Sequence, residues 1–190
     1  MPKEIEAKLK VDSFSQIEKK LESLGARFIA EIVQRDYYFD DAKRDLTKTD
    51  RCLRLREEFA ANSRRSLLAY KGAREKGRFK KRLEIQTQVS DAESLKALLP
   101  AIGYKEKLVY KKRRQLWVYG GCEICLDELP LLGNFVEIEG ESEKRIMRVQ
   151  EELGLSALPH IKESYAALME REICRLGTKE KEAFLRGQKH

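Results

Sequence analysis

Charged and apolar residues alternate along the stretch Glu4-Ile5-Glu6-Ala7-Lys8-Leu9-Lys10-Val11. In an extended strand successive side chains point to opposite faces, so one face of this strand is charged and the other is apolar. A single strand of this kind normally turns its charged face to water, because charged side chains are mostly exposed. A different role requires that later strands repeat the pattern and supply complementary charges.

The composition is that of a globular domain with a high charge content. The chain has 190 residues, of which 42% are hydrophobic and 37% are charged, and its formal net charge is +7. This length fits a single domain, and the basic balance suits an anionic partner. The 32 acidic residues are nearly as numerous as the 39 basic ones, which argues against a simple DNA-binding basic tail.

The cysteines and histidines exclude several kinds of site. Cys122 and Cys125 form a CxxC pair, but in a strand this spacing puts the two sulfurs on opposite faces, so we expect free thiols. The only histidines are His160 and His190, and we do not expect a histidine base. The chain lacks a run of about 18 apolar residues and an apolar leader. We therefore expect a cytoplasmic protein without a membrane partner.

Helical periodicity predicts three helices, each ending before a glycine: Gly25, Gly103 and Gly154. Capping boxes predict that the first begins at Ser13 with Gln16 and the second at Ser90 with Glu93. Apolar stripes on these helices indicate packing faces.

A period of two predicts eight strands, and the short connections indicate that most of them are antiparallel. The expected strands cover residues 4–11, 26–40, 51–59, 64–72, 78–89, 105–119, 121–128 and 134–140. Residues 41–49 are expected to form a polar loop. We assign residues 1–175 to one domain, with residues 176–190 as a charged tail.

Most of these strands repeat the charged face of the first one. Three amphipathic helices need an apolar surface, and the apolar face of the sheet is the obvious one. If the sheet closes with the helices outside, the charged faces point into a lumen. Carboxylates bind hard cations, and Lys and Arg bind phosphate. A lumen with both therefore indicates a metal-bound polyphosphate.

The ordered set of charged motifs resembles the CYTH superfamily, the triphosphate tunnel metalloenzymes, and within it the class IV adenylyl cyclase branch most closely. The motifs are Glu4-x-Glu6-x-Lys8, Gln34-x-Asp36-x-Tyr38, Leu53-Arg54-Leu55-Arg56, Lys71-Gly72, Arg82-x-Glu84, Lys112-x-Arg114, Asp127 and Glu137-x-Glu139. The resemblance implies an α+β fold, an eight-stranded antiparallel closed β-barrel or tunnel with a charged lumen and helices packed outside.

The resemblance also implies roles for individual residues. Mg²⁺ or Mn²⁺ would be held by Glu4, Glu6, Asp127, Glu137 and Glu139. The triphosphate would be bound by Lys8, Arg54, Arg56, Lys71, Arg82, Lys112 and Arg114. Glu4, Glu6 and Lys8 would be catalytic, and Glu84 would support a basic residue or reach a metal through water. Lys111 and Arg113 form an equally good pair on the other face of their strand, but the spacing to Trp117 favours Lys112 and Arg114.

The implied substrate is a small-molecule triphosphate, and two reactions use the same residues. A cyclase would convert ATP to cyclic AMP and pyrophosphate, and the branch resemblance favours this reaction. The alternative is a hydrolase acting on inorganic triphosphate or thiamine triphosphate. A module that binds nucleic acid or polyphosphate without turnover is a remote alternative, because lumenal carboxylates would repel a polynucleotide. We expect no nucleic-acid partner, and a homodimer is left open.

Overall fold

The computed structural model describes residues 3–77, 79–177 and 182–183, with the backbone alone for residues 3, 4, 182 and 183. The described residues form nine strands and five helices. The strands are β1 Lys3–Val11, β2 Arg27–Asp40, β3 Cys52–Ala60, β4 Ser63–Lys71, β5 Lys80–Val89, β6 Lys105–Tyr119, β7 Cys122–Leu129, β8 Gly133–Gly140 and β9 Glu182–Ala183. The helices are α1 Ser15–Ser23, α2 Asp45–Lys48, α3 Ala92–Ala101, α4 Glu143–Glu152 and α5 Tyr165–Arg175.

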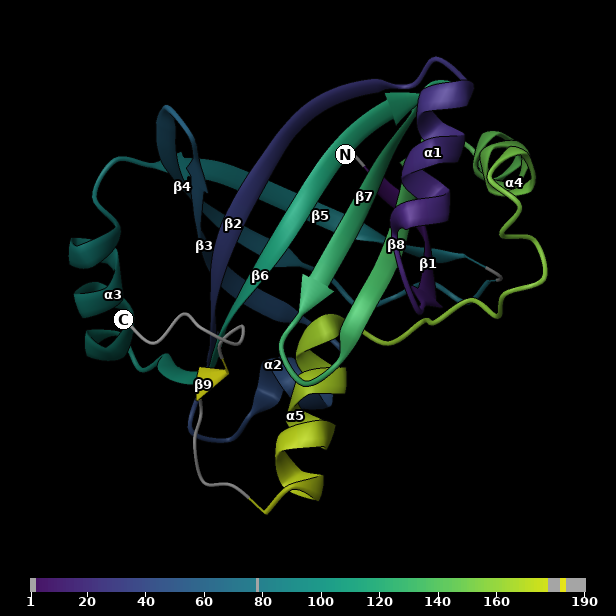
Figure 1. Ribbon diagram of the computed structural model, residues 1–190. Coiled ribbons are helices and arrows are strands. Elements are labelled where there is room, and N and C mark those ends of the chain that lie inside the picture. The colour runs from purple at the N-terminus through teal and green to yellow at the C-terminus, as the bar shows by residue number, and fades with distance from the viewer. Residues whose placement is uncertain (1–2, 78, 178–181, 184–190) are drawn as a thin grey trace.

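Eight of the strands form a closed antiparallel barrel. Their order is β2-β3-β4-β5-β1-β8-β7-β6, and pairing of β2 with β6 closes the ring. The helices lie outside the barrel wall, with α1 and α4 near one end and α2 and α5 near the other (Figure 1). The predicted α+β fold, with an eight-stranded antiparallel tunnel and external helices, is confirmed.

Three segments differ from the sequence prediction. Helix α5 at Tyr165–Arg175 follows the three predicted helices. The expected polar loop at residues 41–49 contains the short helix α2. The expected tail at residues 176–190 contains β9, which pairs in parallel with Val109 and Tyr110 of β6. Residues 178–181 and 184–190 of that tail lie outside the described residues. In the described part of the chain, helices are too short or too polar to cross a membrane.

The two predicted capping boxes are wrong, although the helix ends are right. Helix α1 is capped at Phe14, and Ser13 Oγ instead accepts a hydrogen bond from the Ser15 amide at 3.3 Å. Helix α3 is capped one residue later than expected, by Asp91, which accepts from the Ser94 amide. Ser and Asp are both favourable N-cap residues, so the sequence pattern alone does not decide between the adjacent Ser90 and Asp91. Gly25, Gly103 and Gly154 follow their helices with positive φ, as predicted.

The apolar core lies between the outer face of the barrel and the helices. The largest cluster joins Ile17 and Leu21 of α1 with Ile146 and Val149 of α4 over the apolar face of β1, β7 and β8. Burial of each such side chain contributes about 1.5–3 kcal/mol. The helices therefore turn the strands so that their charged faces point inward.

Helix α4 approaches the barrel closely at Gly140. A Cβ atom there would lie 3.3 Å from Ile146 Cγ1 of α4 and 2.8 Å from Cys122 Sγ of β7. Cys122 belongs to this outer core, whereas Cys125 Sγ lies 3.6 Å from Glu123 Oε1 on the lumen side. Both thiols are free, so the expectation of two sulfurs on opposite faces is confirmed.

Candidate active site

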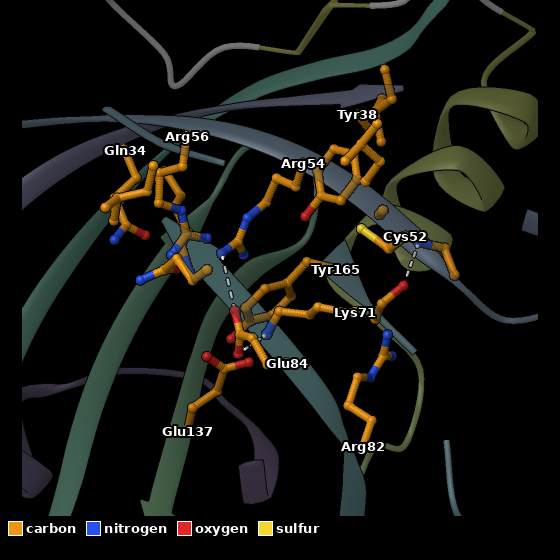
Figure 2. A pocket seen from close by; sticks show the side chains of 18 of the residues that line it. Gln34, Tyr38, Cys52, Arg54, Arg56, Lys71, Arg82, Glu84, Glu137 and Tyr165 are labelled. Atoms are coloured by element: carbon orange, nitrogen blue, oxygen red, sulfur yellow. Dashed lines mark hydrogen bonds and ion pairs between the residues drawn. The ribbon is translucent and has the colours of Figure 1, made fainter. Parts of the chain in front are cut away.

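The barrel encloses a cavity of about 640 Å³. Side chains from all eight barrel strands line it, together with residues of α2 and α5. Figure 2 shows these side chains converging from several strands on one space. Charged side chains from different strands can therefore act on a single ligand.

The structure brings all seven predicted phosphate-binding cations to this cavity. They are Lys8, Arg54, Arg56, Lys71, Arg82, Lys112 and Arg114, and Lys80 joins them. The uncertain register of β6 is also resolved, because Lys112 is 1% exposed and faces the lumen. Arg113 lies on the outside, where it pairs with Glu31 and Glu128.

Arg56 is held by a carboxylate behind the cavity wall. Its Nε and Nη2 donate to the two carboxylate oxygens of Asp36 at 2.6 and 2.8 Å. Asp36 is fully buried. Burial alone would raise the pKa of Asp36, but Arg56 and Arg54 hold it well below its usual range. The ion pair therefore fixes the guanidinium in one orientation at the edge of the cavity.

Replacing Arg56 with alanine is expected to destabilise the protein by about 3–5 kcal/mol, because Asp36 would remain buried and charged without its two hydrogen-bond donors. Denaturant unfolding monitored by circular dichroism measures this loss. The double variant Asp36→Asn/Arg56→Gln removes both charges and should recover most of the stability. Equal losses in the single and double variants would contradict the role of the buried pair.

Asp127 is the centre of a second group of contacts. It accepts hydrogen bonds from Lys112 Nζ at 3.0 Å, from Arg114 Nε at 2.6 Å and Nη2 at 2.5 Å, and from the Tyr165 hydroxyl at 3.0 Å. Burial raises the pKa of Tyr165 well above its usual range, so this hydroxyl keeps its proton and donates. With both oxygens occupied by donors, Asp127 is placed to orient Lys112 and Arg114.

Lys112 titrates near physiological pH. Burial, followed by the positive charge of Arg114, lowers the pKa of Lys112 to about 8. Below that pH the ammonium is charged and attracts phosphate, and above it the attraction is progressively lost.

The affinity for inorganic triphosphate without divalent metal is expected to fall above pH 8 by up to about tenfold per pH unit. Calorimetric titration across pH 7 to 10 measures it. Lys112→Arg is the control, because arginine stays charged across this pH range. The titration of the ligand itself affects both proteins equally, so the difference between their pH profiles reports Lys112. The same pH dependence in both proteins would show that another group is responsible.

Lys8 lies between the acidic and basic parts of the lumen. Its Nζ lies 3.3 Å from Glu137 and 3.7 Å from Glu6, and donates to the backbone carbonyl of Glu163 at 3.0 Å. Glu137 also accepts from Arg114 at 2.6 Å. Although burial raises the pKa of Glu137, the charges of Lys8 and Arg114 hold it well below its usual range. Glu137 therefore carries a negative charge that keeps these cations in position.

Glu84 pairs with two of the cations (Figure 2). Its carboxylate lies 2.9 Å from Lys71 Nζ and 3.8 Å from Arg54 Nη2. The Nε groups of Arg54 and Arg82 are buried and have no hydrogen-bond partner among the described residues. Buried donors of this kind are costly unless something accepts from them, so the two arginines are ready to bind an anion.

The carboxylates suit a hard cation in chemistry and position. Glu6, Glu139 and Glu123 are direct partners across β1, β8 and β7, and all three line the cavity. Within the described side chains, no three His, Cys, Asp or Glu come close enough together to form a complete metal cage. Mg²⁺ is usually bound by one or two carboxylates plus substrate phosphates, so this row fits. The side chain of Glu4 lies outside the described residues, although its backbone in β1 pairs with Arg82.

The cavity also contains groups that the sequence reasoning did not assign to the site. Lys80 Nζ donates to Glu6 Oε1 at 2.6 Å. The ring of Tyr165 lies 4.0 Å from Lys8 Nζ, and its helix α5 covers one end of the barrel. Lys80 could have been found from its alternation with Arg82. Tyr165 was not predicted as a site residue, because its spacing with Leu168 and Met169 is typical of packing residues.

Comparison with known proteins identifies the family. Residues 2–165 match the CYTH domain. The chain belongs to the CYTH domain family. CYTH members are adenylyl cyclases or triphosphatases that act on triphosphate substrates, and the tunnel enzymes among them generally depend on a metal ion. The predicted family and enzyme class are thus confirmed.

Individual CYTH relatives support this assignment. The "Putative adenylate cyclase" of Methanocaldococcus jannaschii is 30% identical over 174 residues, which cover 87% of this chain and 97% of that protein. A solved protein of Pyrococcus horikoshii is 29% identical with a TM-score of 0.77, over 89% of this chain and 99% of that one.

A more distant solved structure shares only the fold. It is a Hippeastrum protein described as a "Putative adenylyl cyclase" with a dominant triphosphatase activity. It is 18% identical with a TM-score of 0.65, over 93% of this chain and 97% of that one.

Proposed function

We propose that this protein is a class IV adenylyl cyclase that converts ATP to cyclic AMP and pyrophosphate with Mg²⁺ or Mn²⁺. The observation that carries the proposal is the enclosed cavity in which buried Nε donors of Arg54 and Arg82 face a space between cations and carboxylates. Such donors require an anion with several oxygens. The similarity of the M. jannaschii relative, which covers nearly its whole length, supports the choice of the cyclase reaction.

The cations would bind the triphosphate in two groups. Lys71 and Arg54 share Glu84, and Arg82 adds its free Nε beside them. Arg56, Lys112 and Arg114 are held by Asp36 and Asp127 behind the wall. Because these groups are oriented before the ligand binds, they lose little freedom when they stabilise charge on the transferred and leaving phosphoryl groups.

A divalent metal would be held by Glu6 and Glu139, with Glu4 as the further predicted ligand. When bound there, it would neutralise phosphate charge and activate an oxygen nucleophile. Asp127 and Glu137 were also predicted as ligands. Their contacts with Lys112, Arg114 and Lys8 favour a different role, in which they orient the cations.

The reaction needs positioning more than a strong base. The ribose 3′-oxygen forms a bond to the α-phosphorus, the bond from that phosphorus to the β-phosphate oxygen breaks, pyrophosphate leaves and the hydroxyl proton is released. Glu6 is buried beside Lys8 and Lys80, and is placed to orient the attacking hydroxyl. Lys8 lies 3.7 Å from Glu6 and 3.3 Å from Glu137, so it would contact the α-phosphate.

The test is a product assay with ATP, inorganic triphosphate and thiamine triphosphate, each with Mg²⁺ or Mn²⁺. Cyclic AMP with equimolar pyrophosphate is the expected result. Orthophosphate from inorganic or thiamine triphosphate would favour the triphosphatase alternative, for which the lumen cations are equally suited. Failure of all three substrates to react would overturn both reactions.

A further inference from the structure

One side of the cavity departs from the charged pattern of the lumen. Ile32 of β2, Leu67 of β4 and Leu116 of β6 are apolar side chains that line the cavity. Ile32 pairs with Arg114, two residues from Leu116, and Leu67 pairs with Arg56. All three therefore adjoin the phosphate-binding cations. They lie toward the end of the barrel formed by the β3–β4 and β6–β7 hairpins, away from α5.

Gln34 lies beside this apolar side, between it and the cations. It pairs across the sheet with Glu58 on β3 and with Lys112 on β6. In Figure 2 it lies next to Arg56, on the other side of the cavity from Tyr38 and Cys52. Its side chain is 2% exposed and lines the cavity.

The orientation of the Gln34 amide is fixed by its neighbours. Nε2 donates to Glu58 Oε1 at 2.6 Å, and Glu58 Oε2 accepts from Arg65 at 2.5 Å. An ionised carboxylate only accepts hydrogen bonds, so the amide must turn its nitrogen toward Glu58. Gln34 Oε1 is consequently a buried acceptor, without a hydrogen-bond partner in the part of the chain that the structure describes.

A buried acceptor without a donor costs free energy that a ligand donor would recover. The ligand group that fits this side must have an apolar, flat body for Ile32, Leu67 and Leu116, and an N–H donor for Gln34. An aminopurine has both. At the opposite end the polar groups are already used: Asp40 accepts from the Leu46 and Thr47 amides, and the Tyr38 and Tyr110 hydroxyls bond to each other at 2.9 Å.

We infer that Ile32, Leu67 and Leu116 form a nucleobase subsite in which Gln34 Oε1 accepts a hydrogen bond from the exocyclic amino group of adenine. This inference rests on the proposed function, because it assumes that the cations hold the triphosphate of the same ligand. The adenine would then bind at the end of the barrel formed by the β3–β4 and β6–β7 hairpins, and Gln34 would be the residue that recognises its amino group.

The experiment compares three ligands by calorimetric titration in EDTA, so that turnover does not interfere. They are ATP, purine riboside triphosphate, which has hydrogen in place of the amino group, and inorganic triphosphate. The wild-type protein is expected to bind ATP about tenfold more tightly than purine riboside triphosphate. In Gln34→Leu this ratio should fall to about one, because the acceptor is gone while the apolar contacts remain.

Gln115→Leu is the matched control. Gln115 is on the outer face of β6, where it donates to Glu18 at 2.7 Å, so the ratio should stay at the wild-type value. Binding of inorganic triphosphate by Gln34→Leu shows that the variant is folded and that its cation site is formed. If Gln34→Leu does not fold, Gln34→Met provides the second test, with the same expected loss of the ratio, because a thioether sulfur is only a weak acceptor.

Two outcomes would overturn the inference while leaving the proposed function intact. One is an unchanged ratio in both Gln34 variants, and the other is a wild-type protein that binds all three ligands with equal affinity. Failure of the wild-type protein to bind any of the three ligands would instead contradict the triphosphate site itself.

Discussion

Replacing Arg82 with alanine is expected to lower the turnover of ATP by about 10²–10³-fold while the fold is retained. Arg82 is 3% exposed and lines the cavity, and its buried Nε has no acceptor among the described residues. Its removal takes away this donor, while Asp50, whose pKa is raised by burial but lowered by Arg74 and then by Arg82, keeps its two hydrogen bonds from Arg74. This distinguishes it from Arg56, whose loss leaves Asp36 buried and charged.

Steady-state kinetics and denaturant unfolding of the same preparations test this expectation. Arg113→Ala is the matched control, because Arg113 is the outward-facing arginine next to the lumen pair of β6 and contacts Glu31 and Glu128. It should keep full turnover. Turnover by Arg82→Ala within about threefold of the control would show that Arg82 does not contact the reacting triphosphate.

Excess EDTA is expected to abolish turnover of ATP, with a loss of at least about a hundredfold, and added Mg²⁺ or Mn²⁺ should restore it. The physical reason is charge: Glu6, Glu139 and Glu123 stand in one row across three strands, where the negative charge on the leaving phosphate grows during the reaction. A metal ion held by these carboxylates would neutralise the developing charge, whereas the lumen cations alone are enough to bind the triphosphate.

Measurement of cyclic AMP formation against free Mg²⁺ tests the metal requirement quantitatively. Glu6→Gln should raise the Mg²⁺ concentration needed for half-maximal turnover, whereas Glu128→Gln, on the outer face of β7 with Arg113, should not. Full turnover by the wild-type protein in excess EDTA would refute the metal requirement.

The barrel and its charged lumen follow from the sequence because strand alternation has a period of two. Once the helices cover the apolar face, the register of each strand decides which charges point inward. Lys112 and Arg114 are inside for this reason, and their neighbour Arg113 is outside. The same alternation places Lys80 beside Glu6, a contact that requires knowledge of which strands are neighbours.

Other features depend on contacts that no local pattern specifies. Two ion-pair groups depend on three-dimensional proximity: Asp36 with Arg56, and Asp127 with Lys112 and Arg114. In both groups the aspartate fixes the orientation of the basic side chains. Helix α2 has four residues and begins after Arg44 in a left-handed conformation, so it lacks both a stripe and a side-chain cap signal. The free acceptor of Gln34 is visible only when Glu58 and Arg65 are in place.

The pairing of β2 with β6 that closes the ring has a consequence for folding kinetics. Asp36 pairs with Tyr110, and Arg27 with Val118, so closure joins segments separated by about half of the chain. Contacts between such distant segments carry a large loop-closure cost, and proteins dominated by them fold in about milliseconds to seconds. The lumen exists only after this step. A triphosphate therefore binds the closed ring and not its open precursors, and by mass action it should slow unfolding more than it speeds folding.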